Sequence, residues 1–564
     1  MSADVREGLI GHWKLSGDCQ DHSGAGNHGQ NHGADLAAKD GAAFDGRSAF
    51  IEVKDSPSLR LGAGDFSVSV CAHTDRDLDD IPGDILSKYD PVARTGFNFS
   101  IQSLAGVTSA QSNDRHLHFG VDAGRIDPAW ADCGRPGNNI FVFALAVHEG
   151  QLYAGTFEHD ADEAGHVYRY AGDAEWIDCG SPDRCNSVTA LAVHEGQLHA
   201  GVSYYRAAGS SLSESPNLHP GGKIYRYAGG KKWVDCGRPS GPSVSQAVNL
   251  EYMMRFIGWL PDQVDGIHNL TVYGGRLYAI PMYHQGLFRY EGGTRWTDCG
   301  TPGVRLMSLA AFNGRLYGAG NDGNKRGGVY QYGGEKTWTR TGDQPGVNQT
   351  YSFAIHEGKL YTGTWPEATV FRYDGREGRR SGESSGEGET WTSCGRLGNE
   401  MEVMGMVVYN GKLYAGTLPL AEVYRYEGGT TWTRTGQLDA TPDVRYRRAW
   451  SMAVYQGRLF CGTLPSGHVY SLEAGKSVTY DHELKPGWRR LVAVRHGDRL
   501  KLYVDGRPVA TSSPFSPADY DLSNDRPLRI GFGSHDHFNG RLRDLRLYNR
   551  ALTDEEVSAL SLSS

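Results

Sequence analysis

The segment Trp176-Ile-Asp-Cys-Gly180 recurs along the chain with small changes, and this recurrence decides the fold. Seven tryptophans open its copies: Trp130, Trp176, Trp233, Trp296, Trp338, Trp391 and Trp432. Five copies read W-x-D/S-C-G and two read W-T-R-T-G, with an apolar run and strand-like segments such as LYAGT and VYRY between copies. Self-similarity at this period, with four short strands per repeat and glycine-rich turns, predicts a β-propeller.

The ends of the repeat region complete each other. The last repeat contains SMAVYQ, RLFCGT and HVYSLEAG but no tryptophan strand, whereas the first tryptophan strand, at Trp130, has no three strands before it. Joining them in one blade closes a ring of seven blades and removes exposed sheet edges. We therefore expect residues 127–474 to form a seven-bladed propeller whose two ends meet.

The flanks, residues 1–126 and 475–564, contain strand-like runs of another style, such as FSVSVCAHT and RRLVAVRHGDRLKLYVDG. Neither flank has the content of a complete domain. Because a domain with adjacent termini can be inserted into a loop at little cost, we expect the flanks to form one sandwich that the propeller splits. The predicted fold class is all-β: a jelly-roll sandwich with an inserted seven-bladed β-propeller.

Five sequence segments in the flanks support a family resemblance: Asp21–Gly29, Ala43–Gly46, Gly487–Val494, Leu502–Gly506 and Gly540–Thr553. In combination they resemble the laminin G-like family of concanavalin A-type jelly rolls, and the repeats loosely resemble kelch-like propellers. The family resemblance implies a structural calcium ion between an early loop and the last strand. The matching candidate ligands are Asp21, Asn27 and Asp544, since calcium prefers oxygen ligands; the alternative is that these side chains only cap turns.

The composition narrows the class of partner. The chain has 564 residues, 76 glycines, 30 tyrosines and a net charge of −9, without a long basic run, so nucleic acid is not an expected partner. No apolar stretch of about 18 residues is present, so we expect no membrane span. The N-terminus does not read as a signal peptide; the protein is expected to be cytoplasmic, or extracellular or periplasmic if a signal was removed.

The nine cysteines are not expected to form a disulfide framework, because five of them occupy the same position on different blades. Cys179 and Cys185 are the one candidate pair. His116-Leu-His118 and His535-Asp-His537 are read either as ordinary surface or as metal ligands. Thr553–Glu556 reads as a capping box before a short helix, and Leu250–Leu260 has helical spacing. His148, His194 and His356 share one hairpin turn and are read as turn residues.

Residues that do not repeat are the candidates for function. In the expected strand order, the loops from strand two to three and from four to one emerge on one face of the propeller. Aromatic rings offer sugars flat apolar faces, and arginine offers a fork for carboxylate or sulfate. These loops therefore predict recognition of an anionic or extracellular polysaccharide, with the jelly roll as a further binding module. The ligand-binding candidates are His159, Tyr205, Arg206, Tyr283, Trp365 and Arg448.

Two other classes of function stay open. A polysaccharide lyase needs a group that neutralises a uronate carboxylate and a base beside it. The candidates for neutralisation are Arg255, Arg445 and Arg447, and those for proton transfer are Tyr204, His268, His284 and Tyr446. A glycosidase would need two carboxylates across the bond, and no spacing singles out a pair. The third class is a protein-interaction scaffold, for which propellers are also suited.

Overall fold

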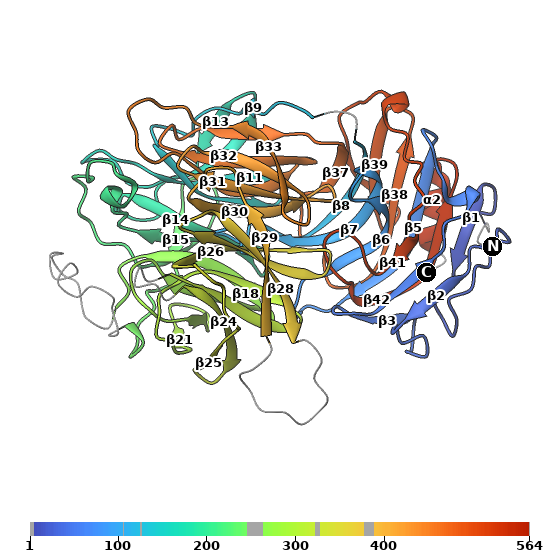
Figure 1. Cartoon of the computed structure of the whole chain (residues 1–564), viewed down its shortest axis with the longest axis horizontal. Coiled ribbons are helices and arrows are strands. Elements are labelled where there is room, and N and C mark those ends of the chain that lie inside the picture. The colour runs from blue at the N-terminus through green and yellow to red at the C-terminus, as the bar shows by residue number, and fades with distance from the viewer. Residues whose placement is uncertain are drawn as a thin grey trace.

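The computed structural model of the protein describes residues 5–104, 106–124, 127–244, 263–321, 327–376 and 389–562. The described chain is all-β and consists of two bodies, a β-propeller and a two-sheet sandwich, that pack side by side (Figure 1). Both chain termini lie on the sandwich, at the end remote from the propeller (Figure 1). Among the described residues, no helix combines the length and the hydrophobicity of a membrane span.

Each sandwich sheet combines strands from both flanks. The first sheet has the order β1 (Leu9–Trp13), β42 (Asn539–Tyr548), β5 (Phe66–Thr74), β38 (Gly487–His496), β39 (Arg499–Val504) and β40 (Arg507–Thr511), with β3 (Ala42–Asp45) also pairing with β42. The second has the order β2 (Gly29–His32), β4 (Phe50–Val53), β41 (Leu528–Ile530), β6 (Gly83–Asp90), β7 (Thr95–Leu104), β8 (Asn113–Ala123) and β37 (Lys476–Tyr480). Because β38 pairs with β5 and β37 with β8, the segments before and after the propeller form one hydrophobic core.

The chain ends in the helix α2 (Asp554–Leu562), as the capping box predicts. The Glu556 carboxylate accepts from the Thr553 backbone N–H (2.9 Å), and the Thr553 hydroxyl accepts from the Glu556 N–H (3.3 Å). These reciprocal bonds satisfy donors that the first helical turn leaves free. The helical spacing in Leu250–Leu260 lies outside the described residues.

In the described part of the chain, five blades of the propeller are separate four-stranded sheets, and an eight-stranded sheet holds two further sets of four strands joined at Phe157 and Ser187. The eight-stranded sheet comprises β10 (Phe141–His148), β11 (Gln151–Phe157), β12 (Val167–Gly172), β13 (Glu175–Asp178), β14 (Ser187–His194), β15 (Gln197–Ser203), β16 (Ile224–Tyr227) and β17 (Trp233–Asp235). The four-stranded sheets are β18 (Ile267–Tyr273), β19 (Arg276–Pro281), β20 (Phe288–Tyr290), β21 (Trp296–Asp298); β22 (Leu306–Phe312), β23 (Arg315–Gly320), β24 (Gly328–Gly334), β25 (Thr337–Arg340); β26 (Gln349–His356), β27 (Lys359–Trp365), β28 (Thr369–Arg376), β29 (Glu389–Arg396); β30 (Glu402–Tyr409), β31 (Lys412–Leu418), β32 (Glu422–Gly428), β33 (Thr431–Gln437); and β34 (Arg448–Tyr455), β35 (Arg458–Leu464), β36 (Val469–Leu472) with β9 (Ala131–Asp132).

The ring closes where the sequence predicts. Strand β9, from the start of the repeat region, is the outer strand of the blade formed by β34, β35 and β36, and it pairs with β36 at Tyr470 and Ser471. Around the axis, the first strand of each set packs beside the first strand of the following set, and β34 of the last set packs beside β10 of the first. The two ends of the repeat region are therefore held together in one blade.

The tryptophan motif links neighbouring blades. The indole N–H of Trp233 donates to the carbonyl of Cys179 (3.0 Å), which belongs to the same motif one blade earlier. Trp176, Trp296, Trp391 and Trp432 make the same bond at 2.6 to 2.9 Å to the preceding motif. Trp130 instead donates to the side-chain hydroxyl of Thr435 (3.2 Å), and the buried indole N–H of Trp338 has no partner among the described residues. The repeated tryptophan therefore has a structural role.

The Asp and Gly of the motif form a turn. The Asp178 carboxylate accepts from the backbone N–H of Gly180 (2.7 Å), and Gly180 has a φ of +86°, a conformation that glycine adopts without strain. The intervening cysteine is buried. All nine cysteines carry free thiols, those of the candidate pair Cys179 and Cys185 included.

The sandwich also enters the propeller. The connection between β7 and β8, residues 106–112, is buried throughout and is called the axis plug below. Asn269 donates to the carbonyl of Thr108 (2.9 Å), and the Trp450 indole donates to the hydroxyl of Ser109 (3.1 Å). Asn269 and Trp450 lie on two of the strands that surround the axis. The plug therefore closes the propeller axis on the sandwich side.

This packing corrects the surface interpretation of His116 and His118. Both imidazoles lie on β8, and they are only 4% and 1% exposed. The propeller covers this face of the sandwich, as the contact between Asn113 and the carbonyl of Val454 on β34 shows (2.7 Å). Among the described residues, no group of three or more His, Cys, Asp or Glu side chains has an arrangement that could hold a metal ion.

Candidate functional site

The candidate site lies where the axial strands begin, on the propeller face opposite the axis plug. Arg448 pairs with Leu464, Glu402 with Leu418 and Gln349 with Trp365, each at the same register in its blade. In the blade of β10 the corresponding position holds the uncharged Phe141. The charged side chains at this level are thus departures from the repeat, and they point to function rather than scaffold.

A buried charged cluster lies at the axis. Glu402 is 4% exposed, and burial raises its pKa to about 7, against the lowering effects of Arg448, a hydrogen bond from Tyr351 and Arg305. Arg305 is held by the carbonyls of Met282 (2.7 Å) and Asn321 (2.7 Å). The cluster combines two fixed guanidinium groups with a carboxyl that can exchange a proton near neutral pH.

Sequence reasoning missed Arg305 and Tyr351, and it considered Glu402 only as one of several loop carboxylates available to a glycosidase, without singling it out. Aligning the repeats position by position could have found them. Each begins an axial strand, or lies near its start, where another copy carries the apolar Phe141.

Around this cluster lies a set of side chains that we call the rim network: Tyr205, Arg206, Ser210, Tyr283, Arg445, Tyr446 and Arg448. Arg448 donates to the hydroxyl of Ser210, which lies in the short 3-10 helix Ala207–Ser210 and also contacts the Tyr205 hydroxyl. Arg448 lies 5.9 Å from the ring centre of Tyr446, and Arg445 lies 4.8 Å from it. Two loops distant in sequence therefore meet at Ser210.

The rim network extends to a third blade. The Tyr283 hydroxyl accepts from the backbone N–H of Arg206 (2.9 Å), and the Arg206 guanidinium lies 5.8 Å from the Tyr283 ring centre. Tyr205 packs edge-on against Phe143, with ring centres 4.7 Å apart. Tyr204 is 6% exposed, and burial raises its pKa. The exposed members that a ligand meets first are Arg445 and, in part, Tyr446 and Arg206.

The two histidines proposed for proton transfer are buried. His268 is 3% exposed, neither ring nitrogen has a hydrogen-bond partner, and its ring centre lies 6.2 Å from that of Trp450. Burial, with a smaller effect of Arg305, lowers the pKa of His268 to about 3. His284 is fully buried, and its Nδ1 lies 2.8 Å from the Asp265 carboxylate. Both imidazoles therefore lie beneath the exposed surface of the rim network.

The remaining candidates lie outside the rim network or at its margin. Arg447 donates to the carbonyls of Pro419 (3.4 Å) and Thr441 (3.2 Å), which holds its own loop. The His159 Nε2 atom lies 2.9 Å from the carbonyl of Ser213, beside the loop that carries Ser210. Trp365 ends β27, where it pairs with Gln349. Arg255 lies outside the described residues.

The three calcium candidates are near each other, but their chemistry does not fit the ion. Asp21 and Asp544 both contact His12: the His12 N–H donates to Asp21 (2.9 Å), and the His12 Nε2 lies 2.9 Å from Asp544. Asp544 also accepts from Arg490 (2.8 Å) and Arg546 (2.8 Å). Although burial opposes ionisation, His12 and the two arginines hold the pKa of Asp544 well below its usual range.

The oxygens of the other two candidates are also engaged. Asp21 accepts from the backbone N–H groups of Ser23 (2.8 Å) and Asn27 (2.9 Å) and from the Ser23 hydroxyl (2.9 Å). The Asn27 side-chain oxygen accepts from the Ser56 hydroxyl (2.7 Å). Arginine and histidine thus occupy the charge position that a calcium ion would take.

Comparison with known proteins identifies one part of the chain. The profile of the concanavalin A-like lectin/glucanases superfamily matches residues 438–558, a stretch that begins in the propeller at the end of β33 and continues through the second part of the sandwich. No curated protein matches the chain.

Several solved structures are weakly similar to the chain. The WD40 β-propeller domain of Doa1 is 11% identical (TM-score 0.37), and YCF48 bound to D1 peptide is 10% identical (TM-score 0.39); each alignment covers 61% of this chain and 96% of the other. The Trypanosoma rangeli sialidase in complex with 2,3-difluorosialic acid is 10% identical (TM-score 0.27), and the alignment covers 83% of this chain and 98% of that one. Structural similarity this weak gives no information about the activity of the chain. The chain thus contains a β-propeller and a concanavalin A-like domain.

Proposed function

We propose that the protein recognises a carbohydrate and that the rim network binds an anionic polysaccharide. The observation that carries the proposal is the meeting of two segments at Ser210, one with Arg445, Tyr446 and Arg448 and the other with Tyr205 and Arg206. Guanidinium groups form paired hydrogen bonds with carboxylate or sulfate, and the half-buried Tyr446 ring beside two guanidinium groups adds apolar surface that a sugar ring can contact. The superfamily match in the sandwich is compatible with a carbohydrate-related role.

The architecture that supports this proposal has three inferred features. We count the two sets of strands in the eight-stranded sheet as separate blades, which makes seven in all. We assign residues 127–474 to the propeller and residues 1–126 with 475–564 to the jelly roll, which serves as a further binding module. A kelch-like type for the propeller remains a prediction from the sequence.

The test is binding of polygalacturonate and chondroitin sulfate, with neutral laminarin for comparison. We expect the wild type to bind at least one of the two anionic chains, with affinity that falls as salt rises. Replacing Tyr446 by Ala, or Arg445 by Ala, should weaken binding about tenfold, equivalent to about 1.4 kcal/mol. The matched control is Arg434→Ala, since Arg434 is on β33 and its guanidinium pairs with Glu422. Absence of binding to both anionic chains, or equal binding by all variants, would refute the proposal.

A second candidate function is a polysaccharide lyase or glycosidase in the same place. The observation that favours it is Glu402, a buried carboxyl with a pKa near 7 beside Tyr351 and two arginines. Incubation with polygalacturonate then yields new absorbance from unsaturated uronate ends if the protein is a lyase, and new reducing ends without that absorbance if it is a glycosidase. Binding without either product leaves recognition as the function. A protein-interaction scaffold is the third class, and it is favoured if no glycan binds.

A further inference from the structure

A chain of cavities follows the seam between the sandwich and the propeller, away from the rim network. Two of them, of about 720 Å³ and 340 Å³, share Tyr480 and His482. The 340 Å³ cavity shares Glu483 and Lys485 with a third cavity. This third cavity shares His194 and Glu195 with a fourth cavity of about 350 Å³. Because neighbouring cavities share walls, they form one elongated depression, which we call the seam groove.

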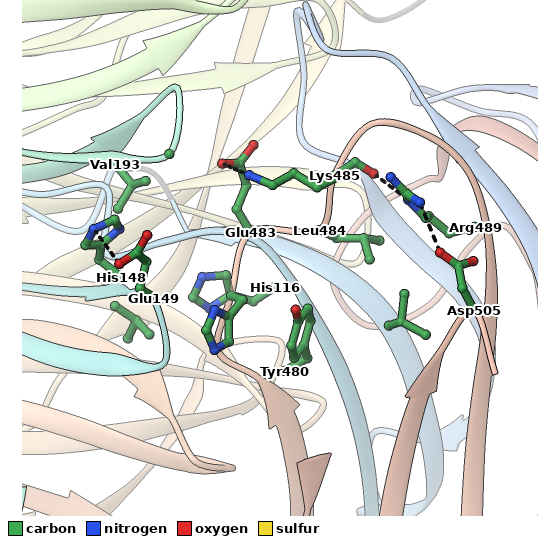
Figure 2. Close-up of a pocket in the computed structure, with 14 residues that line it drawn as sticks. His116, His148, Glu149, Val193, Tyr480, Glu483, Leu484, Lys485, Arg489 and Asp505 are labelled. Atoms are coloured by element: carbon green, nitrogen blue, oxygen red, sulfur yellow. Dashed lines mark hydrogen bonds and ion pairs between the residues drawn. The ribbon is translucent and has the colours of Figure 1, made fainter. Parts of the chain in front are cut away.

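The groove exists only because the two bodies pack together. One wall is the propeller turn with His148 and Glu149, and the other is the sandwich segment from Tyr480 to Arg489 (Figure 2). The Gly150 N–H of the same turn donates to the carbonyl of Asp481 (2.8 Å), which fixes the spacing of the walls. The strands β37 and β40 each end one sandwich sheet and line the larger cavity. The repeated hairpin turn, read from sequence as scaffold alone, thus also lines the groove.

The centre of the groove is an aromatic platform. The rings of Tyr480 and His482 are stacked, with centres 5.0 Å apart and planes 25° apart. Among the described residues, neither the Tyr480 hydroxyl nor the His482 ring has a hydrogen-bond partner, although both residues line the cavities of about 720 Å³ and 340 Å³. These polar groups are therefore available to a ligand lying across the platform.

The charges of the groove oppose a polyanion. Two cations of the groove are paired with carboxylates: Lys485 lies 3.7 Å from Glu483, and Arg489 lies 3.0 Å from Asp505 (Figure 2). Arg458, which lines the larger cavity, donates to the hydroxyl of Ser471. The larger cavity adds the carboxyls of Asp481 and Glu473 and a row of hydroxyls at Thr511–Ser513. Carboxylates and hydroxyls accept and donate hydrogen bonds to sugar hydroxyls without needing charge on the ligand.

We propose that the seam groove is a second carbohydrate site, which binds a neutral oligosaccharide of several units with one sugar ring stacked on the Tyr480–His482 platform. It differs from the rim network in place and in ligand charge, so each proposal can fail without the other. An extended chain is favoured over a single sugar because the cavities continue along the seam past three successive propeller turns.

The test is calorimetric titration of the full-length protein with cellohexaose, laminarihexaose, maltohexaose and mannohexaose. We expect at least one of them to bind, Tyr480→Ala and His482→Ala each to weaken that binding about tenfold, and Tyr480→Phe, which keeps the ring, to bind within a few-fold of wild type. The matched control is Trp488→Ala, because the Trp488 ring is on the sandwich but stacks with Arg543 (4.3 Å) outside the groove.

Three results would overturn the proposal: no binding by any of the four sugars, binding that Tyr480→Ala leaves unchanged, or binding lost in Tyr446→Ala instead. Circular dichroism of each variant identifies misfolding. Because the His482 side chain is exposed, His482→Ala keeps the test valid if Tyr480→Ala does not fold. If the rim variants lose polygalacturonate binding while none of the four oligosaccharides binds to the protein, only the groove proposal is rejected.

Discussion

The buried carboxyl of Asp84 should make the stability of the protein fall as pH rises. Asp84 lies on β6 at the junction of the two bodies, and it is 1% exposed. One carboxylate oxygen accepts the backbone N–H groups of His535 (2.8 Å) and Asp536 (2.9 Å), and the other oxygen has no partner among the described residues. Next to these residues, the carbonyl of Ser534 accepts from the N–H of Glu357 in the propeller (3.1 Å).

The magnitude follows from the pKa. Burial raises the pKa of Asp84 from 3.8 to about 7, although two backbone N–H groups favour the charged form. A difference of about 3 pKa units corresponds to about 4 kcal/mol. Because the folded-state pKa is the higher one, this stability is fully present below pH 3.8 and is lost as pH rises through 7.

The perturbation is Asp84→Asn, which keeps the shape and removes the ionisation. The amide oxygen can accept the two backbone N–H groups, while the amide nitrogen takes the unpartnered place at a cost of about 1–3 kcal/mol. Below pH 4 the variant should therefore be less stable than wild type by about that amount. At pH 8, where ionised Asp84 costs wild type about 4 kcal/mol, the variant should be the more stable protein by about 1–3 kcal/mol.

The assay is urea unfolding at several values between pH 4 and pH 8, followed by tryptophan fluorescence and circular dichroism. Asp80 and Asp536 lie nearby and have raised pKa values of their own, so the difference between the two proteins is the relevant quantity. Asp79→Asn, at an exposed carboxylate, is the control and should show no crossing. Parallel stability curves for wild type and Asp84→Asn would refute the reasoning.

Two further predictions follow from the same structure. Trp233→Phe should lower the free energy of unfolding by about 1 kcal/mol more than Trp338→Phe does, because both variants lose similar packing but only Trp233→Phe loses an indole hydrogen bond. Equal losses for the two variants in urea unfolding would contradict the role assigned to the blade-to-blade hydrogen bond. Millimolar calcium chloride should leave the melting temperature within about 1 °C of its value in a chelator, since hydrogen-bond donors already engage Asp21 and Asp544. An ion that binds the folded state and is present at 100 times its Kd would add about 2.7 kcal/mol of stability. A rise of several degrees in scanning calorimetry would show that an ion binds there or elsewhere.

The repeated residues were the most predictable part of the site region. Trp176 and Asp178 act within a local motif and its nearest neighbour, so each copy in the sequence reports the same environment. The closure of the ring through Trp130 was predictable for the same reason, because one blade lacked a strand that only the other end of the repeat region could supply. The position of the rim loops was also foreseeable, since the up-and-down order of strands in each blade places the loops next to Arg448 and Tyr205 on one face of the propeller.

The buried charges were not foreseeable in the same way. Arg305, Tyr351 and Glu402 come from three blades, and their mutual influence arises only when the axis brings them together. The pairing of Asp544 with Arg490 depends likewise on the sheet order, because β42 and β38 lie on either side of β5, a strand that the propeller separates from both of them in sequence. The family resemblance therefore implied a calcium ion at Asp544, whereas in the folded chain arginine side chains contact this carboxylate.

By itself the sequence determined the propeller repeat, the split sandwich and the terminal helix, because each depends on periodicity, turn chemistry or capping that acts over a few residues. Only the tertiary structure decided that a sandwich loop plugs the axis, that His116 and His118 are buried, and that Tyr480 faces a propeller turn. Those features depend on how two bodies pack, and packing depends on shape and exposed area over surfaces whose residues are scattered along the chain.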